Sequence, residues 1–304
     1  MGRELIQEPG SHGLTDEQIV HIPGLESRWV RLENGAKAHY VTSGETGPAV
    51  ILLHGGIVGS SGTAGWRFMA PFLGANGFRV YCPDQPGYGW ADTREEYWPK
   101  NGVQSYVEFV RMFADALGID KFHLAGNSMG CGHTIYFAVN HPERLLSYAL
   151  IATGNPGDLV PADKRVAIPD GKFTPNPNYK RPPWDGTEES MRVLMAGIIY
   201  KAEAVWPELI TMRNEAALRQ QASQNARSES LARLESDPNY KQWASIKDRF
   251  PKLTIPSIYL YGMNDVLGPV ENGFVQEDLL PNVQMFYPDE CGHQGQTDQP
   301  DMFN

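Results

Sequence analysis

Three residues far apart in the chain, Ser128, Asp265 and His293, have the chemistry needed to turn an alcohol into a nucleophile. Ser128 is the centre of the sequence GNSMG, which lies between two mostly apolar runs. A serine between glycines where a strand turns directly into a helix is typical of a nucleophile elbow, because the glycines leave room for a strained turn that exposes the hydroxyl. The alternative, a serine that only caps the following helix, stays open.

A serine hydroxyl is a weak nucleophile at neutral pH, so it needs a general base and a third group that orients this base. Asp265 and His293 each follow an apolar, strand-like run late in the chain. The carboxyl ends of parallel strands meet at one edge of a sheet, where ligands bind, and the order Ser, Asp, His is the expected one. We therefore predict His293 as the base and Asp265 as the acid, with Asp158 as an alternative acid.

Acyl transfer also needs hydrogen-bond donors that face the developing oxyanion. The amide of Met129, at the start of the predicted helix, is one candidate, and the amide of Gly56 in the sequence HGG is the second. A phosphate cradle is the alternative function for this glycine-rich loop. Neither GxGxxG nor Gly-Lys-Ser/Thr is present to support it.

The elements that must position these residues follow an alternating pattern. Apolar runs such as 49–55 alternate with helical segments such as 103–117, and this rhythm predicts a mostly parallel, twisted sheet flanked by helices. The first two strands surround the turn Asn34-Gly35, which indicates an antiparallel hairpin at the start of the sheet. The predicted fold class is α/β.

The pattern changes between residues 154 and 249, where a proline-crowded loop precedes helical stretches that contain methionine and tryptophan. We predict a helical lid over 154–249, inserted into a core formed by 1–153 and 250–304. Substrate would bind between the lid and the sheet edge. We expect substrate contacts from the following residues: Gly55, Asn127, Trp206, Arg213 and Gln294.

The overall composition narrows the range of partners. The chain has 304 residues, a formal net charge of -10 and three widely spaced cysteines. This composition argues against nucleic acid or an anionic membrane as a partner, and against a disulfide framework or a zinc site. The first residues lack the pattern of a signal peptide, and no apolar run approaches a membrane-spanning length. We expect a cytoplasmic protein with a small-molecule substrate, no metal and no cofactor, and leave a homodimer open.

Several motifs together resemble the α/β-hydrolase superfamily, over roughly residues 49–153 and 253–304. They are HGG, DQPGYG, GNSMG, GMNDVLGP and CGH. Within this superfamily, GNSMG and the segment 208–213 are similar to the meta-cleavage product hydrolases, which break a carbon-carbon bond in dienoate acids made from opened aromatic rings. The resemblance implies that Arg213 holds the substrate carboxylate, as a guanidinium does well. An ordinary surface arginine is the alternative.

The chain also departs from that family pattern. Gln294 follows His293 where the family often has tryptophan, the loop after His54 is longer, and Phe68 replaces a polar residue. The chain ends soon after His293, where the fold usually continues into a last helix. These departures leave the cleaved bond open: an ester or lactone, for example an aromatic half-ester, is the alternative to a carbon-carbon bond. A non-catalytic receptor for a small ligand on the same fold is a second alternative.

Overall fold

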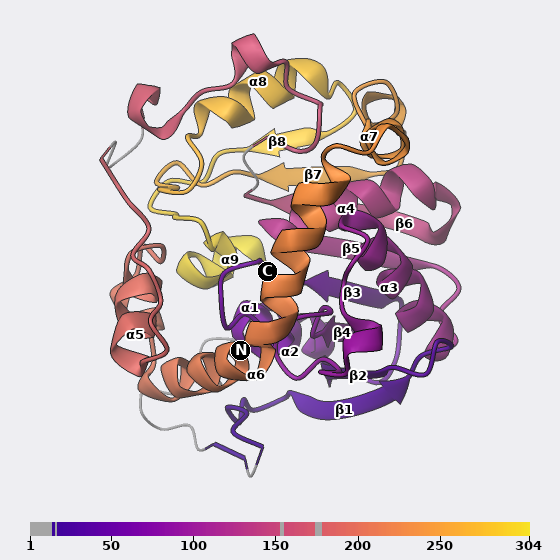
Figure 1. Cartoon of the computed structure of the whole chain (residues 1–304), viewed down its shortest axis with the longest axis vertical. Helices are drawn as coiled ribbons and strands as arrows, with labels where there is room; N and C mark the ends of the chain where they lie inside the picture. The colour runs from indigo at the N-terminus through magenta and orange to yellow at the C-terminus, as the bar shows by residue number, and fades with distance from the viewer. Residues whose placement is uncertain (1–13, 16, 153–154, 174–177) are drawn as a thin grey trace.

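The computed structural model describes residues 14–15, 17–152, 155–173 and 178–304. The N-terminal segment considered as a leader, 1–13, lies outside the described residues. One sheet holds eight strands in the order β1-β2-β4-β3-β5-β6-β7-β8 (Figure 1). The strands are β1 (Glu26–Arg31), β2 (Lys37–Ser43), β3 (Ala49–Leu53), β4 (Arg79–Pro83), β5 (Phe122–Asn127), β6 (Leu145–Ile151), β7 (Ser257–Leu260) and β8 (Gln284–Phe286).

The sheet is antiparallel at one edge and parallel elsewhere, as the sequence predicts. β1 and β2 form the hairpin, in which the amide of Leu32 donates to the carbonyl of Ala36 and Gly35 has a φ of 90°. β2 pairs antiparallel with β4, whereas every pairing from β4 through β8 is parallel. The carboxyl ends of six strands therefore share one edge, which is where loops can assemble a site.

Helices cover the sheet and make up most of the segment for which a lid is predicted. The α-helices are α1 (Gly62–Trp66), α2 (Met69–Ala75), α3 (Val103–Ala116), α4 (Met129–Asn140), α5 (Glu188–Ala196), α6 (Pro207–Leu234), α7 (Pro238–Ala244), α8 (Glu271–Leu279), α9 (Gly295–Asp298) and α10 (Pro300–Phe303). Short 3-10 turns are η2 (Glu95–Tyr97), η3 (Pro142–Arg144), η4 (Ala162–Lys164), η5 (Ile168–Asp170), η6 (Ala202–Ala204) and η7 (Phe250–Lys252). None of the helices described is both long and apolar enough to cross a membrane.

The central strand β3 shows why this sequence forms a covered sheet. All five of its residues are buried, and alternate side chains belong to different apolar clusters. Ile51 and Leu53 join the cluster that contains α3 and α4, whereas Val50 and Leu52 join the cluster around Trp66 of α1. A strand with both faces buried needs apolar residues at every position, so a continuous run replaces simple alternation.

The lid helices α5, α6 and α7 lie between β6 and β7 in the chain, and α6 crosses the molecule in front of the sheet in Figure 1. α6 packs on the loops that follow β3 and β4. A Cβ built on Gly59 would lie 2.3 Å from the carbonyl oxygen of Arg213, and one on Gly87 would lie 3.0 Å from Ser223 Oγ. The expected start of the lid at 154 falls outside the described residues, and the division at 249 stays a prediction.

Candidate active site

The turn between β5 and α4 places Ser128 in a strained conformation. Ser128 has φ 55° and ψ -116°, and its amide donates to the carbonyl of Ile151 at 2.8 Å. A Cβ on Gly126 would lie 2.1 Å from the carbonyl oxygen of Gly130, and one on Gly130 would lie 2.2 Å from that of Leu53. Strand and helix therefore pass too close for side chains, which explains the glycines on both sides of the serine. A left-handed non-glycine residue costs about 1–3 kcal/mol and commonly marks a functional site.

Ser128, His293 and Asp265 form one hydrogen-bonded chain at the carboxyl edge of the sheet. Ser128 Oγ lies 2.8 Å from His293 Nε2, and His293 Nδ1 lies 2.8 Å from Asp265 Oδ2. A carboxylate only accepts, so Nδ1 donates and Nε2 is left to accept the serine proton. The other oxygen of Asp265 accepts from the amides of Leu267 and Gly268, at 2.7 and 3.1 Å. His293 and Asp265 are both buried.

The alternative acid has other partners. Asp158 accepts from Ser245 Oγ at 2.6 Å and from the amide of Ile246 at 2.7 Å, so it holds the chain just after α7. His133, on the helix after Ser128, contacts Gln85 Oε1 at 2.6 Å. The structure therefore places Asp265 beside His293, and it places Asp158 and His133 elsewhere.

The loop after β3 lies against the nucleophile. A Cβ on Gly55 would lie 3.3 Å from Ser128 Cβ, and one on Gly56 would lie 3.0 Å from Met129 Sδ. His54 holds this loop, because its Nδ1 donates to the carbonyl of Gly55 and its Nε2 accepts from the amide of Gln85. Burial lowers the pKa of His54, which keeps the ring neutral. Met129 is the first residue of α4, so its amide has no acceptor within the helix.

Three predicted substrate residues occupy structural positions. The amide of the Asn127 side chain donates to the carbonyl of His293 at 2.9 Å and so ties β5 to the histidine loop. Trp206 is 3% exposed and packs edge to face on Phe68, with ring centroids 5.6 Å apart. Gln294 directly precedes α9, and its buried Oε1 has no hydrogen-bond partner among the described residues.

Arg213 is a buried cation on α6. Its side chain is 1% exposed, which rules out the alternative of a surface arginine. Nε and Nη1 have no hydrogen-bond partner within the described part of the chain, and no carboxylate described there forms an ion pair with it. Burial lowers the pKa of Arg213 to about 10, so the guanidinium keeps its charge at neutral pH. Two donor atoms of Arg213 thus lack a described partner, although Arg213 is not among the residues that line the cavity at Ser128.

A cavity of about 350 Å³ lies beside Ser128. Its lining residues are Gly56, Ile57, Tyr88, Ser128, Met129, Arg181, Arg227, Leu267 and His293. The sequence prediction missed the lining residues Ile57, Tyr88, Leu267, Arg181 and Arg227. Tyr88 and Leu267 lie in the motifs DQPGYG and GMNDVLGP, which were the available signal for them. No motif indicates which residues of 154–249 reach Ser128.

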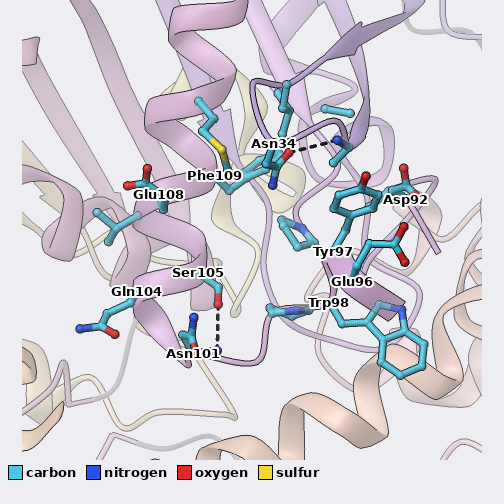
Figure 2. Close-up of a pocket in the computed structure, with 18 of the residues that line it drawn as sticks. Asn34, Asp92, Glu96, Tyr97, Trp98, Asn101, Gln104, Ser105, Glu108 and Phe109 are labelled. Carbon is cyan, nitrogen blue, oxygen red and sulfur yellow. Dashed lines mark hydrogen bonds between the residues drawn. The ribbon is translucent and has the colours of Figure 1, made fainter. Parts of the chain in front are cut away.

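A second hollow lies away from this site. It has a volume of about 580 Å³, and Figure 2 shows Tyr97 and Trp98 on one side and Glu108 of α3 on the other. It contains none of the three triad residues. Among the described residues, no group of three or more His, Cys, Asp or Glu side chains is placed to hold a metal ion.

Comparison with known proteins agrees with this geometry. A family model described as the alpha/beta hydrolase fold matches residues 48–186. The observed sheet and this match confirm the predicted fold class and the resemblance to the α/β-hydrolase superfamily.

Individual similar proteins have named activities, whereas the family model describes only a fold. The 2-hydroxy-6-oxononadienedioate/2-hydroxy-6-oxononatrienedioate hydrolase 1 of Pseudomonas putida is 29% identical over 284 residues, which is 91% of this chain and 94% of the relative. The solved meta-cleavage product hydrolase CumD of Pseudomonas fluorescens has a TM-score of 0.68 at 26% identity, covering 91% of this chain and 94% of that one. A solved bacterial membrane phospholipase A has a TM-score of 0.72 at 25% identity, covering 91% and 82%.

Proposed function

We propose that this protein is a serine hydrolase of small, carboxylate-bearing organic molecules, and that it hydrolyses a carbon-carbon bond in a ring-opened dienoate. The hydrogen-bonded chain from Ser128 through His293 to Asp265 is the observation that carries this proposal. The names of the relatives support the substrate class, because several act on dienedioates. The substrates in these names are small molecules, so we also propose a small-molecule substrate for this protein. A cytoplasmic location and a homodimer stay predictions.

The proposed reaction begins when the enol hydroxyl of the dienoate loses its proton and the dienoate carbon beside the existing ketone gains one, so that the enol becomes a second carbonyl and that carbon becomes saturated. His293 then takes the proton of Ser128, or of a water held beside it, and the oxygen adds to the ketone carbon. The carbonyl oxygen becomes an oxyanion, for which the amides of Gly56 and Met129 are the proposed donors. When the carbon-carbon bond breaks, its electron pair passes into the conjugated second carbonyl, and the proton held by His293 is returned, which gives a shorter dienol acid. Attack by Ser128 leaves an acyl group on the serine, which water then releases as a carboxylic acid, whereas attack by water gives that acid directly.

Arg213 is the proposed partner of the dienoate carboxylate. Its buried guanidinium has two unpartnered donor atoms and no described carboxylate beside it. Charge-assisted, two-point binding of a carboxylate would satisfy those donors. The proposal gives the lid a direct part in orienting the substrate above the serine.

Ester hydrolysis is the second candidate function. It needs only acyl transfer, with no protonation at carbon, and the same serine, base and amides would perform it. Gln294 directly follows His293 where the carbon-carbon hydrolases often have tryptophan, and the similarity to the solved phospholipase A supports this alternative. A lactone would be cleaved in the same manner, and a receptor without turnover is the remaining alternative.

A panel of a ring-opened dienoate, an aromatic half-ester and a lactone, assayed with wild type and Ser128→Ala, tests the proposal. We expect fastest turnover of the dienoate, and a loss of roughly 10⁴-fold or more in kcat for the variant. Preference for the half-ester or the lactone would replace the carbon-carbon assignment. Equal turnover by wild type and Ser128→Ala would overturn the mechanism, and binding without turnover would identify a receptor.

A further inference from the structure

A fully buried carboxylate follows the proposed base by five residues. Asp298 is the last residue of α9. Its Oδ2 accepts from the amide of Gly292 at 2.8 Å, and its Oδ1 accepts from the amide of Lys201 at 3.0 Å. In the described part of the chain, no cation forms an ion pair with Asp298. Backbone amides therefore satisfy this buried charge in place of a cation.

The two amides belong to segments that are far apart in the chain. Gly292 directly precedes His293, whereas Lys201 lies between α5 and η6, in the segment for which a lid is predicted. The two segments are also in direct contact, because a Cβ built on Gly292 would lie 3.1 Å from the carbonyl oxygen of Ile198. The carboxylate thus bonds to both sides of a junction between residues 198–201 and the loop that carries the proposed base.

A carboxylate suits this junction because both of its oxygens accept and neither donates. Burial raises the pKa of Asp298, while the amides of Lys201, Gly292 and Tyr200 act against that rise by stabilising the charged form. Such charge-assisted hydrogen bonds are about twice as strong as neutral ones. An asparagine side chain has a single acceptor oxygen, so it could keep one of the two bonds and would turn an N–H group toward the other amide.

Two asparagines hold the same loop from the side of the sheet. The amide of Asn264 donates to the carbonyl of Cys291 at 2.9 Å, and the amide of Cys291 donates to Asn264 Oδ1 at 3.1 Å. The side chain of Asn127 donates to the carbonyl of His293 at 2.9 Å. The bonds of Asp298 complete this set, since they hold the residue before His293 from the side of residues 198–201.

We propose that Asp298 is a positioning residue, which fixes the loop of His293 to residues 198–201 and so holds the imidazole in the geometry that proton transfer from Ser128 requires. Asp298 is not among the residues that line the cavity beside Ser128, so it acts through the backbone of Gly292. This inference rests on the function proposed above, because it takes His293 as the base.

The first test is kinetic and uses Asp298→Asn. A shift of a catalytic group by about 1 Å costs up to roughly 100-fold in rate. We therefore expect kcat on the best substrate to fall by about 10- to 100-fold, with KM within a few-fold of wild type. The rate at which a phosphonylating reagent labels Ser128 should fall by a similar factor, because both rates depend on His293.

Temperature separates positioning from a purely structural role. Both rates are measured well below the Tm of the Asp298→Asn protein, so that the folded form is assayed. A carboxylate that only stabilises the fold would lower the Tm and leave kcat and the labelling rate as in wild type. That result would overturn the proposal.

Asp289→Asn is the matched control, because Asp289 is an exposed carboxylate of the same loop, and its Oδ1 accepts from the amide of Glu290. It should keep the rates of the wild type, and an equal loss in Asp289→Asn would contradict a specific role for Asp298.

Gly292→Ala tests the same junction from the other side. It keeps the carboxylate but adds a Cβ that would lie 3.1 Å from Asp298 Oδ2 and from the carbonyl oxygen of Ile198. We expect a smaller loss in both rates than in Asp298→Asn. If Asp298→Asn does not fold, Gly292→Ala decides, and wild-type rates in that protein would overturn the proposal.

Hydrogen exchange detected by mass spectrometry separates this inference from the proposed reaction. In Asp298→Asn, the segment whose amide loses its acceptor, 198–201 or 291–293, should exchange faster, while α3 exchanges as in wild type. Unchanged exchange in both segments would contradict the junction. If His293→Ala is labelled as fast as wild type, the assignment of the base fails, and exchange then decides on the junction alone. If His293→Ala is labelled slowly but Asp298→Asn is labelled at the wild-type rate, only the positioning role fails.

Discussion

The pair of Asp265 and His293, at the carboxyl edge of the sheet, and the helix α6 differ in how their buried polar groups are bonded. At the sheet edge, the carboxylate of Asp265 accepts from His293 and from two backbone amides, and His293 uses both ring nitrogens. On α6, buried atoms of Arg213, Gln220 and Ser223 have no hydrogen-bond partner among the described residues. The pair of Asp265 and His293 is internally satisfied, whereas Gln294 beside it and α6 still have unpartnered polar atoms among the described residues.

This difference in hydrogen bonding indicates different functions for the two regions. A fully bonded network holds reacting groups in one geometry, which proton transfer between Ser128 and His293 requires. An unpartnered buried donor costs free energy, and a ligand that bonds to it recovers that cost. We therefore infer that the sheet edge supplies the chemistry and that the lid supplies recognition.

The largest expected effect comes from breaking the network at the sheet edge. In Asp265→Asn the amide can donate to His293 Nδ1, which favours the tautomer that cannot accept the proton of Ser128. We expect kcat to fall by about 10⁴-fold with little change in KM, because the pocket stays in place. Steady-state kinetics on the best substrate of the panel measures both constants.

Asp158→Asn is the matched control for that variant, because Asp158 bonds to Ser245 and Ile246 away from the base. It should keep kcat within a few-fold of wild type. If Asp158→Asn were as damaging as Asp265→Asn, the assignment of the acid would have to be revised.

An intermediate effect comes from the lid. Burial lowers the pKa of Arg213 to about 10, which means that the folded protein disfavours its charged form. Arg213→Met removes this charge, so the free energy of unfolding at pH 7 should rise by roughly 1–3 kcal/mol. The same change should raise KM for carboxylate substrates about 10- to 100-fold.

Denaturant unfolding measures the expected rise in the free energy of unfolding, and steady-state kinetics measures the expected rise in KM. Arg213→Lys keeps the charge but loses the planar fork, so it should weaken substrate binding without the gain in stability. An Arg213→Met protein that is less stable than wild type would show that the guanidinium has a structural partner instead.

The smallest expected effect concerns His133, a buried ring on α4 behind the nucleophile. Burial lowers the pKa of His133 well below 6.5, so the ring is neutral in the folded protein and takes up a proton on unfolding at lower pH. This difference makes stability fall as pH drops below 6.5, by up to about 1.4 kcal/mol per pH unit. In His133→Phe, which can still stack on Tyr106, this slope should become shallower by about one proton.

Unfolding free energies measured between pH 7 and pH 5 give that slope. An unchanged slope in His133→Phe would mean that other groups account for the acid sensitivity. Either result leaves the sheet edge intact, because His133 bonds to Gln85 and not to the triad.

The sequence predicted the parts of the site that local rules control. Gly126 and Gly130 are required by close contacts within one turn and with the neighbouring strand, so the pattern of glycines around Ser128 carries its own explanation. Asp265 and His293 follow parallel strands, and the carboxyl ends of such strands meet at one edge. The fold class and the resemblance to the α/β-hydrolase superfamily could be predicted because they also depend on local patterns and motifs.

The placement of the lid could not be predicted in this way. The contact of Arg227 with Met129 and the packing of Trp206 on Phe68 join segments far apart in the chain. Helical periodicity shows which face of α6 is apolar, but it does not say which loop that face covers. The role of Asn127 as a tie to His293 likewise depends on a contact between residues 166 positions apart.

If His293 takes the proton of Ser128, the rate at which a phosphonylating active-site reagent labels Ser128 must depend on His293. We predict a single label on Ser128, located by mass spectrometry, and labelling at least about 10³-fold slower in His293→Ala. Equal labelling rates in the two proteins, or a label on a different residue, would contradict the account.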